Sequence, residues 1–137
     1  MKKKQKGFTL LELLVVIGII AILLGFAAVS FAAAQKRSRD VRRREDLKAM
    51  QNALEQYNAA EGFVYPDDCD DAASYMQGSW PVDPGGSLLG YEYTACAVDS
   101  YCICVDLETD DVGNSSDNAC SWGSGAGADY YCVANLQ

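Results

Sequence analysis

The fold is decided by residues 2–34, which read KKKQKGFTLLELLVVIGIIAILLGFAAVSFAAA. A basic segment ends at Gly7, and the apolar run that begins at Phe8 is interrupted by one ionisable residue, Glu12. As a helix that rises about 1.5 Å per residue, 10–34 would span roughly 37 Å, more than the hydrocarbon core of a bilayer. The stretch therefore predicts a membrane-spanning helix.

The carboxylate of Glu12 needs an explanation inside such a run. A charged side chain at the centre of a bilayer costs about 2.5–3.5 kcal/mol on insertion scales, so a partner for it is expected. The alternative is a plain anchor in which Glu12, five residues after Gly7, reaches back to the membrane interface. A cleaved secretory signal is disfavoured, because its small-residue site would follow the apolar run, whereas Gly7–Phe8 precedes it.

The string GFTLLELLVVIGIIAIL, which begins at Gly7, closely resembles the N-terminus of type IV prepilins and of the pseudopilins of type II secretion. The resemblance implies that a prepilin peptidase cuts after Gly7 and methylates the new amino terminus at Phe8. It also implies that Glu12 pairs with the free amine of a neighbouring subunit during assembly. A buried carboxylate and a buried ammonium each offset the desolvation of the other. Many family members carry a proline where this chain has Val29.

Composition limits what the rest of the chain can do. The 137 residues allow one modest domain besides the anchor, and the net charge is −8. All 11 basic residues fall within the first 48 positions, whereas fifteen of the 19 acidic residues come later. An acidic C-terminal part disfavours nucleic acid and anionic lipid as its ligands. The chain has no histidine, the commonest general base, and we expect no catalytic activity.

A dense basic block, residues 36–48 (KRSRDVRRREDLK), follows the apolar run. Seven basic residues lie after the run and four before it, which by the positive-inside rule alone would place the C-terminal part in the cytoplasm. Six cysteines that need an oxidising compartment, and the resemblance, indicate the opposite orientation, with the N-terminus inside. We interpret the block as a solvated helical face with Arg–Asp and Arg–Glu pairs. The alternative is packing against an acidic head in the next subunit of a fibre.

An amphipathic continuation of the helix is predicted after the basic block. Apolar residues recur there at steps of three and four, namely Leu47, Met50, Leu54 and Tyr57. Gly62 is the expected C-cap and Pro66 a stop, so one helix is predicted from Phe8 to Glu61. The expected parts are a leader at 1–7, a transmembrane and polymerisation helix at 8–34, the amphipathic continuation at 35–61, and a disulfide-bonded extracytoplasmic head at 62–137.

The head is predicted to hold a small antiparallel sheet of three or four strands. Residues 91–97 and 101–107 alternate apolar with other residues and read as a hairpin around a three-residue turn, and 130–136 supply another strand. Asp70 or Asp71 is expected to cap a short helix before the sheet. The fold class is therefore α+β, a long N-terminal helix with a small sheet, like that of type IV pilins.

Six cysteines allow fifteen disulfide connectivities. Structural disulfides are favoured over a zinc site or a redox centre, because no histidine and no CxxC motif accompany the cysteines. Cys102 and Cys104 would lie on one face of a strand and should bond to other residues. Our hypothesis for the pairing is Cys120 with Cys132, Cys96 with Cys102, and Cys69 with Cys104.

Acidic residues at the end of the second predicted strand and in the loop that follows it admit a calcium site. They are Asp106, Glu108, Asp110 and Asp111. Hard oxygen ligands on a flexible loop suit calcium, although the spacing is not that of an EF-hand. Some pseudopilins bind calcium in a comparable loop. The alternative is a solvated acidic loop without a cofactor.

These features predict a structural subunit of a type IV pilus-like fibre. The partners that the resemblance implies are copies of itself, other pilin-like subunits, prepilin peptidase and an inner-membrane assembly platform. The subunit would sit in the cytoplasmic membrane before assembly and in a surface fibre afterwards. One alternative is a pseudopilin of a type II secretion or DNA-uptake machine. The other is a membrane-anchored binding domain that never polymerises.

Overall fold

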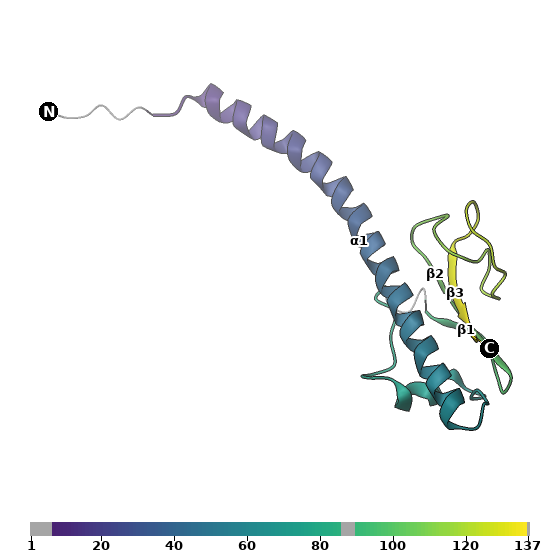
Figure 1. The fold of residues 1–137 in the computed structure, drawn as a ribbon. Coiled ribbons are helices and arrows are strands. Elements are labelled where there is room, and N and C mark those ends of the chain that lie inside the picture. The colour runs from purple at the N-terminus through teal and green to yellow at the C-terminus, as the bar shows by residue number, and fades with distance from the viewer. Residues whose placement is uncertain (1–6, 86–89, 137) are drawn as a thin grey trace. The chain divides into compact units, whose positions relative to one another are not determined.

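The computed structural model describes residues 7–85 and 90–136. The elements run in the order α1 (Leu10–Ala60), the 3-10 helix η1 (Cys69–Tyr75), β1 (Glu92–Ala97), β2 (Ser100–Asp106) and β3 (Tyr130–Ala134) (Figure 1). The predicted α+β class is confirmed. The chain divides into two compact units, Met1–Gln35 and Lys36–Gln137. All of the predicted leader except Gly7 lies outside the described residues.

Helix α1 starts two residues later and ends one residue earlier than the predicted range. It runs from Leu10 to Ala60, and Gly62 follows with a positive φ of 84°. The backbone N–H of Phe63 donates to the carbonyl of Asn58 at 2.8 Å, as in a Schellman cap. The left-handed conformation favours glycine, so the prediction of Gly62 as the end of the helix is confirmed.

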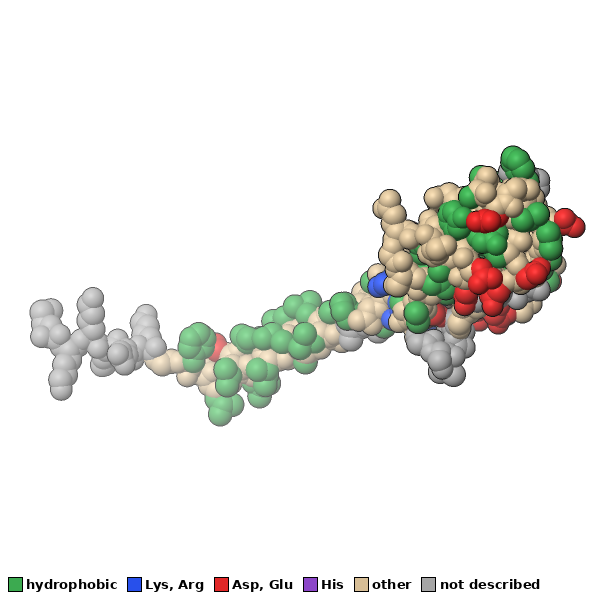
Figure 2. All heavy atoms as spheres, turned by 90° about the horizontal axis from the view of Figure 1, so that it is seen from below, with side chains coloured by type: hydrophobic (Ala, Val, Ile, Leu, Met, Phe, Trp, Pro, Cys, Tyr) green, Lys and Arg blue, Asp and Glu red, His purple; other side chains and the backbone are tan. Residues whose placement is uncertain are grey.

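In the unit Met1–Gln35, α1 has an apolar surface that nothing within the unit covers. All of its described side chains are exposed, including Leu10 at 81% and Phe26 at 75% (Figure 2). An 18-residue window with a mean hydropathy of 2.9 makes the helix long and apolar enough to cross a membrane. Apolar area on this scale needs lipid or protein partners.

In the unit Lys36–Gln137, α1 contributes one side of the core. The predicted apolar stripe is correct at Leu47, Met50 and Leu54, whose side chains are fully buried. They pack against side chains of the sheet and of the connecting segments. The core residues from those parts of the chain are Tyr65, Cys69, Ala72, Tyr101, Ile103, Val105, Leu107 and Val133.

The three described strands form an antiparallel sheet in the order β1-β2-β3 (Figure 1). The β1–β2 turn contains two residues, Val98 and Asp99, because Ala97 pairs with Ser100. The predicted three-residue turn is therefore wrong by one position. Because strand residues alternate between faces, the shorter turn places Cys96 opposite Tyr101 and not opposite Cys102.

Strand β2 is buried on both faces. Ile103 and Val105 belong to the core shared with α1, whereas Cys102 and Cys104 form a second cluster with Cys132 of β3. Alternation along the strand sends successive side chains to opposite faces. The central strand β2 is therefore covered by α1 on one face and by the cysteine cluster on the other.

The short helix η1 begins earlier than its predicted cap. Asp68 is the N-cap, and its side chain accepts from the N–H of Asp70 at 3.1 Å. The predicted caps, Asp70 and Asp71, lie inside the first turn. Cys69, the first residue of η1, is buried and bonded to Cys96.

Candidate functional site

The predicted cleavage junction lies immediately before α1. Phe8 is 85% exposed, and a Cβ added at Gly7 would meet nothing within 4 Å among the described atoms. Neither residue belongs to a helix or strand. An exposed segment outside helices and strands is accessible to a peptidase at its scissile bond.

Glu12 makes a local contact that the sequence reasoning missed. One of its oxygens, Oε2, accepts from the backbone N–H of Thr9 at 3.0 Å and from the Thr9 hydroxyl at 2.8 Å. The Glu12 N–H donates to that hydroxyl at 3.2 Å. This reciprocal arrangement is a capping box, and the signal for it was present in the sequence as TLLE.

The capping box gives Glu12 a role within a single chain. Both hydrogen bonds reach Oε2, and no bond to Oε1 is recorded among the residues that the structure describes. Because a carboxylate has about four acceptor positions, Glu12 can cap α1 and still accept from an amine of another subunit. The two roles are compatible, and a variant of Thr9 separates them.

A second functional cluster joins α1 to the head through the buried side chain of Arg43, which is 0% exposed. Its Nε lies 3.1 Å from Asp83, and its Nη1 lies 2.9 Å from Asp40 and 3.0 Å from Glu108. Arg39 adds a two-pronged contact to Glu108, at 2.6 and 2.5 Å. We call Arg39, Asp40, Arg43, Asp83 and Glu108 the ionic cluster.

The ionic cluster also fixes the backbone around it. Asp40 accepts from the N–H groups of Glu108 and Thr109, at 2.9 and 3.1 Å, and Asp83 accepts from the N–H of Gly85 at 2.8 Å. Two buried atoms of the cluster, Arg43 Nη2 and Asp83 Oδ2, have no recorded hydrogen-bond partner. When charges are withdrawn from water in this way, removing one partner is strongly destabilising, because the remaining charge is left unpaired.

The cluster corrects our interpretation of residues 36–48 as a solvated face. The predicted Arg–Asp and Arg–Glu pairs exist, but Arg43 and Asp40 are buried, and two of the acids come from the head. A sequence signal was available. Asp40, Arg43 and Leu47 follow one another at steps of three and four, so the apolar stripe of α1 continues into charged residues.

The ionic cluster lowers the pKa of Glu108 to about 2 from the ordinary 4.5, chiefly through hydrogen bonds from Arg39 and Arg43. A lowered pKa stabilises the fold above about pH 4.5, and the contribution disappears as the pH falls toward 2. We expect a loss of about 2 kcal/mol over that range, allowing for solvent screening. Chemical denaturation at several pH values measures it. Glu108→Gln should flatten the dependence, and an unchanged slope would contradict this assignment.

All six cysteines are paired in the structure, as Cys69–Cys96, Cys102–Cys120 and Cys104–Cys132. The three hypothesised pairings, Cys120–Cys132, Cys96–Cys102 and Cys69–Cys104, are therefore wrong. The register explains the difference, because Cys104 of β2 lies directly opposite Cys132 of β3, with a Cα–Cα distance of 4.1 Å. The loop after β2 then brings Cys120 to Cys102, with a Cα–Cα distance of 6.2 Å.

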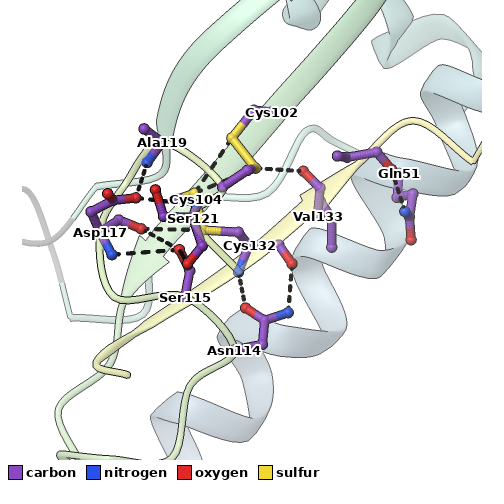
Figure 3. Close-up of a disulfide and its surroundings, with 12 residues drawn as sticks. Gln51, Cys102, Cys104, Asn114, Ser115, Asp117, Ala119, Ser121, Cys132 and Val133 are labelled. Atoms are coloured by element: carbon purple, nitrogen blue, oxygen red, sulfur yellow. Dashed lines mark hydrogen bonds between the residues drawn. A yellow bond between two sulfur atoms is a disulfide. The ribbon is translucent and has the colours of Figure 1, made fainter. Parts of the chain in front are cut away.

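Two of the disulfides touch each other on one face of the sheet (Figure 3). The Sγ atoms of Cys102 and Cys104 are 3.7 Å apart, so these residues share a face and bond elsewhere, as predicted. Cys102, Cys104 and Cys120 are the group of potential metal ligands found together in residues 7–85 and 90–136. Because each is in a disulfide, none offers the thiolate that a zinc site requires.

Asn114 holds the loop against β3 beside these disulfides (Figure 3). Its side chain donates to the carbonyl of Cys132 at 2.9 Å and accepts from the Cys132 N–H at 2.7 Å.

The backbone at Gly113 lies very close to the backbone at Ala128. A Cβ added at Gly113 would lie 2.6 Å from the carbonyl oxygen of Ala128. Contacts of this kind depend on the tertiary fold and left no signal in the sequence.

Peptide mapping of unreduced protein should recover the three disulfides of the structure. Replacing both Cys104 and Cys132 by serine should cost about 2–4 kcal/mol of stability, because the closed loop restricts the unfolded chain. Changing both partners leaves no unpaired thiol, and thermal denaturation measures the loss. A peptide that links Cys120 to Cys132 would contradict the pairing.

The residues of the calcium hypothesis are dispersed in the structure. Glu108 is bound to Arg39 and Arg43, and one oxygen of Asp111 accepts from the N–H of Gly127 at 2.5 Å. Asp106 ends β2, and Asp110 is exposed. Calcium binding by this loop stays a prediction, which calorimetric titration with calcium would check.

Comparison with known proteins gives two matches, and no solved structure matches the chain. Residues 2–28 match the family model described as "Prokaryotic N-terminal methylation motif". The relative "Type II secretion system core protein G" of Vibrio cholerae serotype O1 (strain ATCC 39315 / El Tor Inaba N16961) is 36% identical over 64 residues. The match covers 47% of this chain and 43% of that relative, so less than half of either protein is compared.

The methylation motif contains Gly7, Phe8 and Glu12, which stand at the start of α1 where the helix is apolar and exposed. The motif, the relative and the helix-plus-sheet fold agree with one another. These findings support a place for the chain in the type IV pilin and pseudopilin family, through its N-terminal part. Members of this family are structural subunits that are anchored in a membrane by the N-terminal helix.

Proposed function

We propose that the protein is a subunit of a pilus-like fibre that assembles through α1 after cleavage between Gly7 and Phe8. The observation that carries the proposal is the first part of α1. It leaves its apolar side chains exposed while one carboxylate, Glu12, stands four residues from the new amino terminus. In a fibre, neighbouring helices would cover that apolar surface, and each Glu12 would accept from the amine of the next subunit.

This function needs no catalytic group in the head. The six cysteines of the head form the three disulfides, and its Asp83 and Glu108 belong to the ionic cluster, so these residues have structural roles. The proposed partners are further copies of the chain, other pilin-like subunits, prepilin peptidase and a membrane assembly platform. Before assembly the helix would span the cytoplasmic membrane with its N-terminus inside, which places the cysteines on the oxidising side.

The second candidate is a pseudopilin that works in a secretion machine and forms a short fibre. The similarity to the Vibrio cholerae type II secretion core protein favours it. Imaging of cells that produce the chain separates the two functions. Long surface fibres support a pilus, whereas secretion that depends on the chain without surface fibres supports a pseudopilus.

Cleavage at the proposed junction is the first test. We expect a mature chain that begins with N-methylated Phe8, and we expect Gly7→Val to block cleavage because a β-branched residue restricts the extended backbone. Intact mass measures both. Gly18→Val is the matched control, since Gly18 also faces open space but lies inside α1. Assembled protein that retains Met1 would refute the processing step and the proposed function with it.

A further inference from the structure

We propose that a hollow beside Arg37 and Arg44 is the docking surface for the acidic segment 67–71 of a second copy of this chain. The proposal rests on the proposed fibre and specifies one contact between its subunits. It concerns the unit Lys36–Gln137 alone and is independent of the pairing of Glu12 with an amine.

The hollow has a volume of about 260 Å³. Its lining residues come from α1 and from the loop after β2, and they are Arg37, Asp40, Val41, Arg44, Thr109 and Val112. Val41 and Val112 are 52% and 43% exposed, so the surface is partly apolar. The charge of Asp40 is already used by Arg43 and by two backbone N–H groups. The charge left for a ligand is therefore positive.

The two arginines of the hollow are available to a partner. Arg37 is exposed, and no ion pair is recorded for Arg37 or Arg44 within 7–85 and 90–136. Arg44 lies over the ring of Tyr131 at 5.4 Å and donates to the carbonyl of Val112, while its Nε is buried without a hydrogen-bond partner. Arg44 is thus held in place beside the exposed Arg37, and guanidinium groups bind carboxylates through charge-assisted hydrogen bonds.

The acidic segment has the complementary property. Asp67, Asp68, Asp70 and Asp71 are all exposed, and no basic residue occurs in the chain after Lys48. No ion pair to any of the four is recorded in the described part of the chain, where Asp68 only caps η1. The disulfide Cys69–Cys96 fixes the segment, so little conformational freedom would be lost on docking.

A contact between two different patches of identical subunits is heterologous. Such contacts repeat from one copy to the next and generate open helical filaments when the rotation does not close a ring. A basic hollow that binds an acidic segment of the next copy therefore suits a fibre and disfavours a closed dimer. Because both patches face water before docking, the contact should weaken with increasing salt.

Photo-crosslinking identifies the partner of the hollow. The full chain carries p-benzoylphenylalanine in place of Val41, and fibres are made from a mixture of isotope-labelled and unlabelled subunits. We expect mixed-isotope cross-links to peptides that contain residues 67–71. Fibres whose cross-links map elsewhere would overturn this contact alone. Failure of the unmodified chain to form fibres would overturn the proposed function, and this contact with it.

A charge exchange tests the same contact independently. Arg37→Glu with Arg44→Glu, and separately Asp67→Lys with Asp71→Lys, should each reduce fibre yield at least about tenfold, the equivalent of about 1.4 kcal/mol. Combining all four changes should restore most of the yield. Arg42→Glu, an exposed neighbour outside the hollow, is the control. Arg37→Glu is also tested alone, because it leaves Arg44 and its contacts in the fold unchanged. Its fibre yield should also fall, in proportion to the one arginine removed. No restoration by the exchange would overturn the proposal.

Discussion

Replacing Glu12 by alanine should abolish fibres or shorten them severely while the chain remains inserted in the membrane and cleaved after Gly7. The change leaves the amine of Phe8 without an anion in an apolar environment. Truncating one partner of a buried ion pair costs about 3–5 kcal/mol, a factor of roughly 10² or more for each contact. Fibre yield relative to membrane-bound subunit measures the effect. Glu12→Gln should fail similarly, and Glu12→Asp should rescue only in part.

The matched control for this prediction is Thr9→Ala. It removes the hydroxyl that shares the capping box with Glu12, at a cost of about 1 kcal/mol to the start of α1, but leaves the carboxylate in place. Fibres that survive Thr9→Ala and disappear in Glu12→Ala would assign the loss to the missing charge. Equal losses in both variants would mean that Glu12 acts through the cap. Normal fibres from Glu12→Ala would refute the proposed role.

Replacing Arg43 by methionine should be the most destabilising change of one side chain in the unit Lys36–Gln137. Methionine replaces the aliphatic stem of arginine but carries no guanidinium, so Asp40, Asp83 and Glu108 are left with Arg39 as the sole cation of the cluster. Removing one partner from a buried ion pair costs about 3–5 kcal/mol, a large part of the stability of a small domain. Chemical denaturation of the full chain in detergent measures the loss.

Arg42→Met is the control for that experiment, because Arg42 is the exposed neighbour of Arg43 on α1. A substitution at such a site usually changes stability by less than about 0.5 kcal/mol. Arg43→Lys should recover only part of the loss, since an ammonium cannot form the planar contacts that the guanidinium makes to several carboxylates. Equal stability of the Arg42 and Arg43 variants would show that the ionic cluster does not hold α1 to the head.

The structural features that depend on patterns of neighbouring residues were predictable from the sequence. The apolar run, the stripe of Leu47, Met50 and Leu54, the end of the helix at Gly62 and the β1–β2 hairpin each depend on residues close together in the chain. The same holds for Gly7, Phe8 and Glu12, whose spacing is itself the motif. Such features can be predicted without knowledge of the tertiary fold.

The pairing of the cysteines and the burial of Arg43 depend on register and on distant segments. One residue fewer in the β1–β2 turn moved the partner of Cys96 from Cys102 to Tyr101. Likewise, Asp83 lies 40 residues from Arg43 in the chain, and no local sequence pattern predicts their contact. The capping box of Thr9 and Glu12 is a different case. The sequence TLLE matches the capping-box pattern, so this contact was predictable from the sequence, but it was not predicted.

Two of the disulfides, Cys69–Cys96 and Cys104–Cys132, also determine how far the head can stretch under a pulling force. The shortest covalent path from Cys69 to Cys132 crosses to Cys96, follows the chain to Cys104 and then crosses again. At roughly 3.4 Å per residue that path measures about 40 Å, whereas the unbridged chain between the same ends would reach about 210 Å. Under tension the head would therefore reach its maximum length after a short extension. Oxidised subunits would remain compact under forces that unfold reduced subunits.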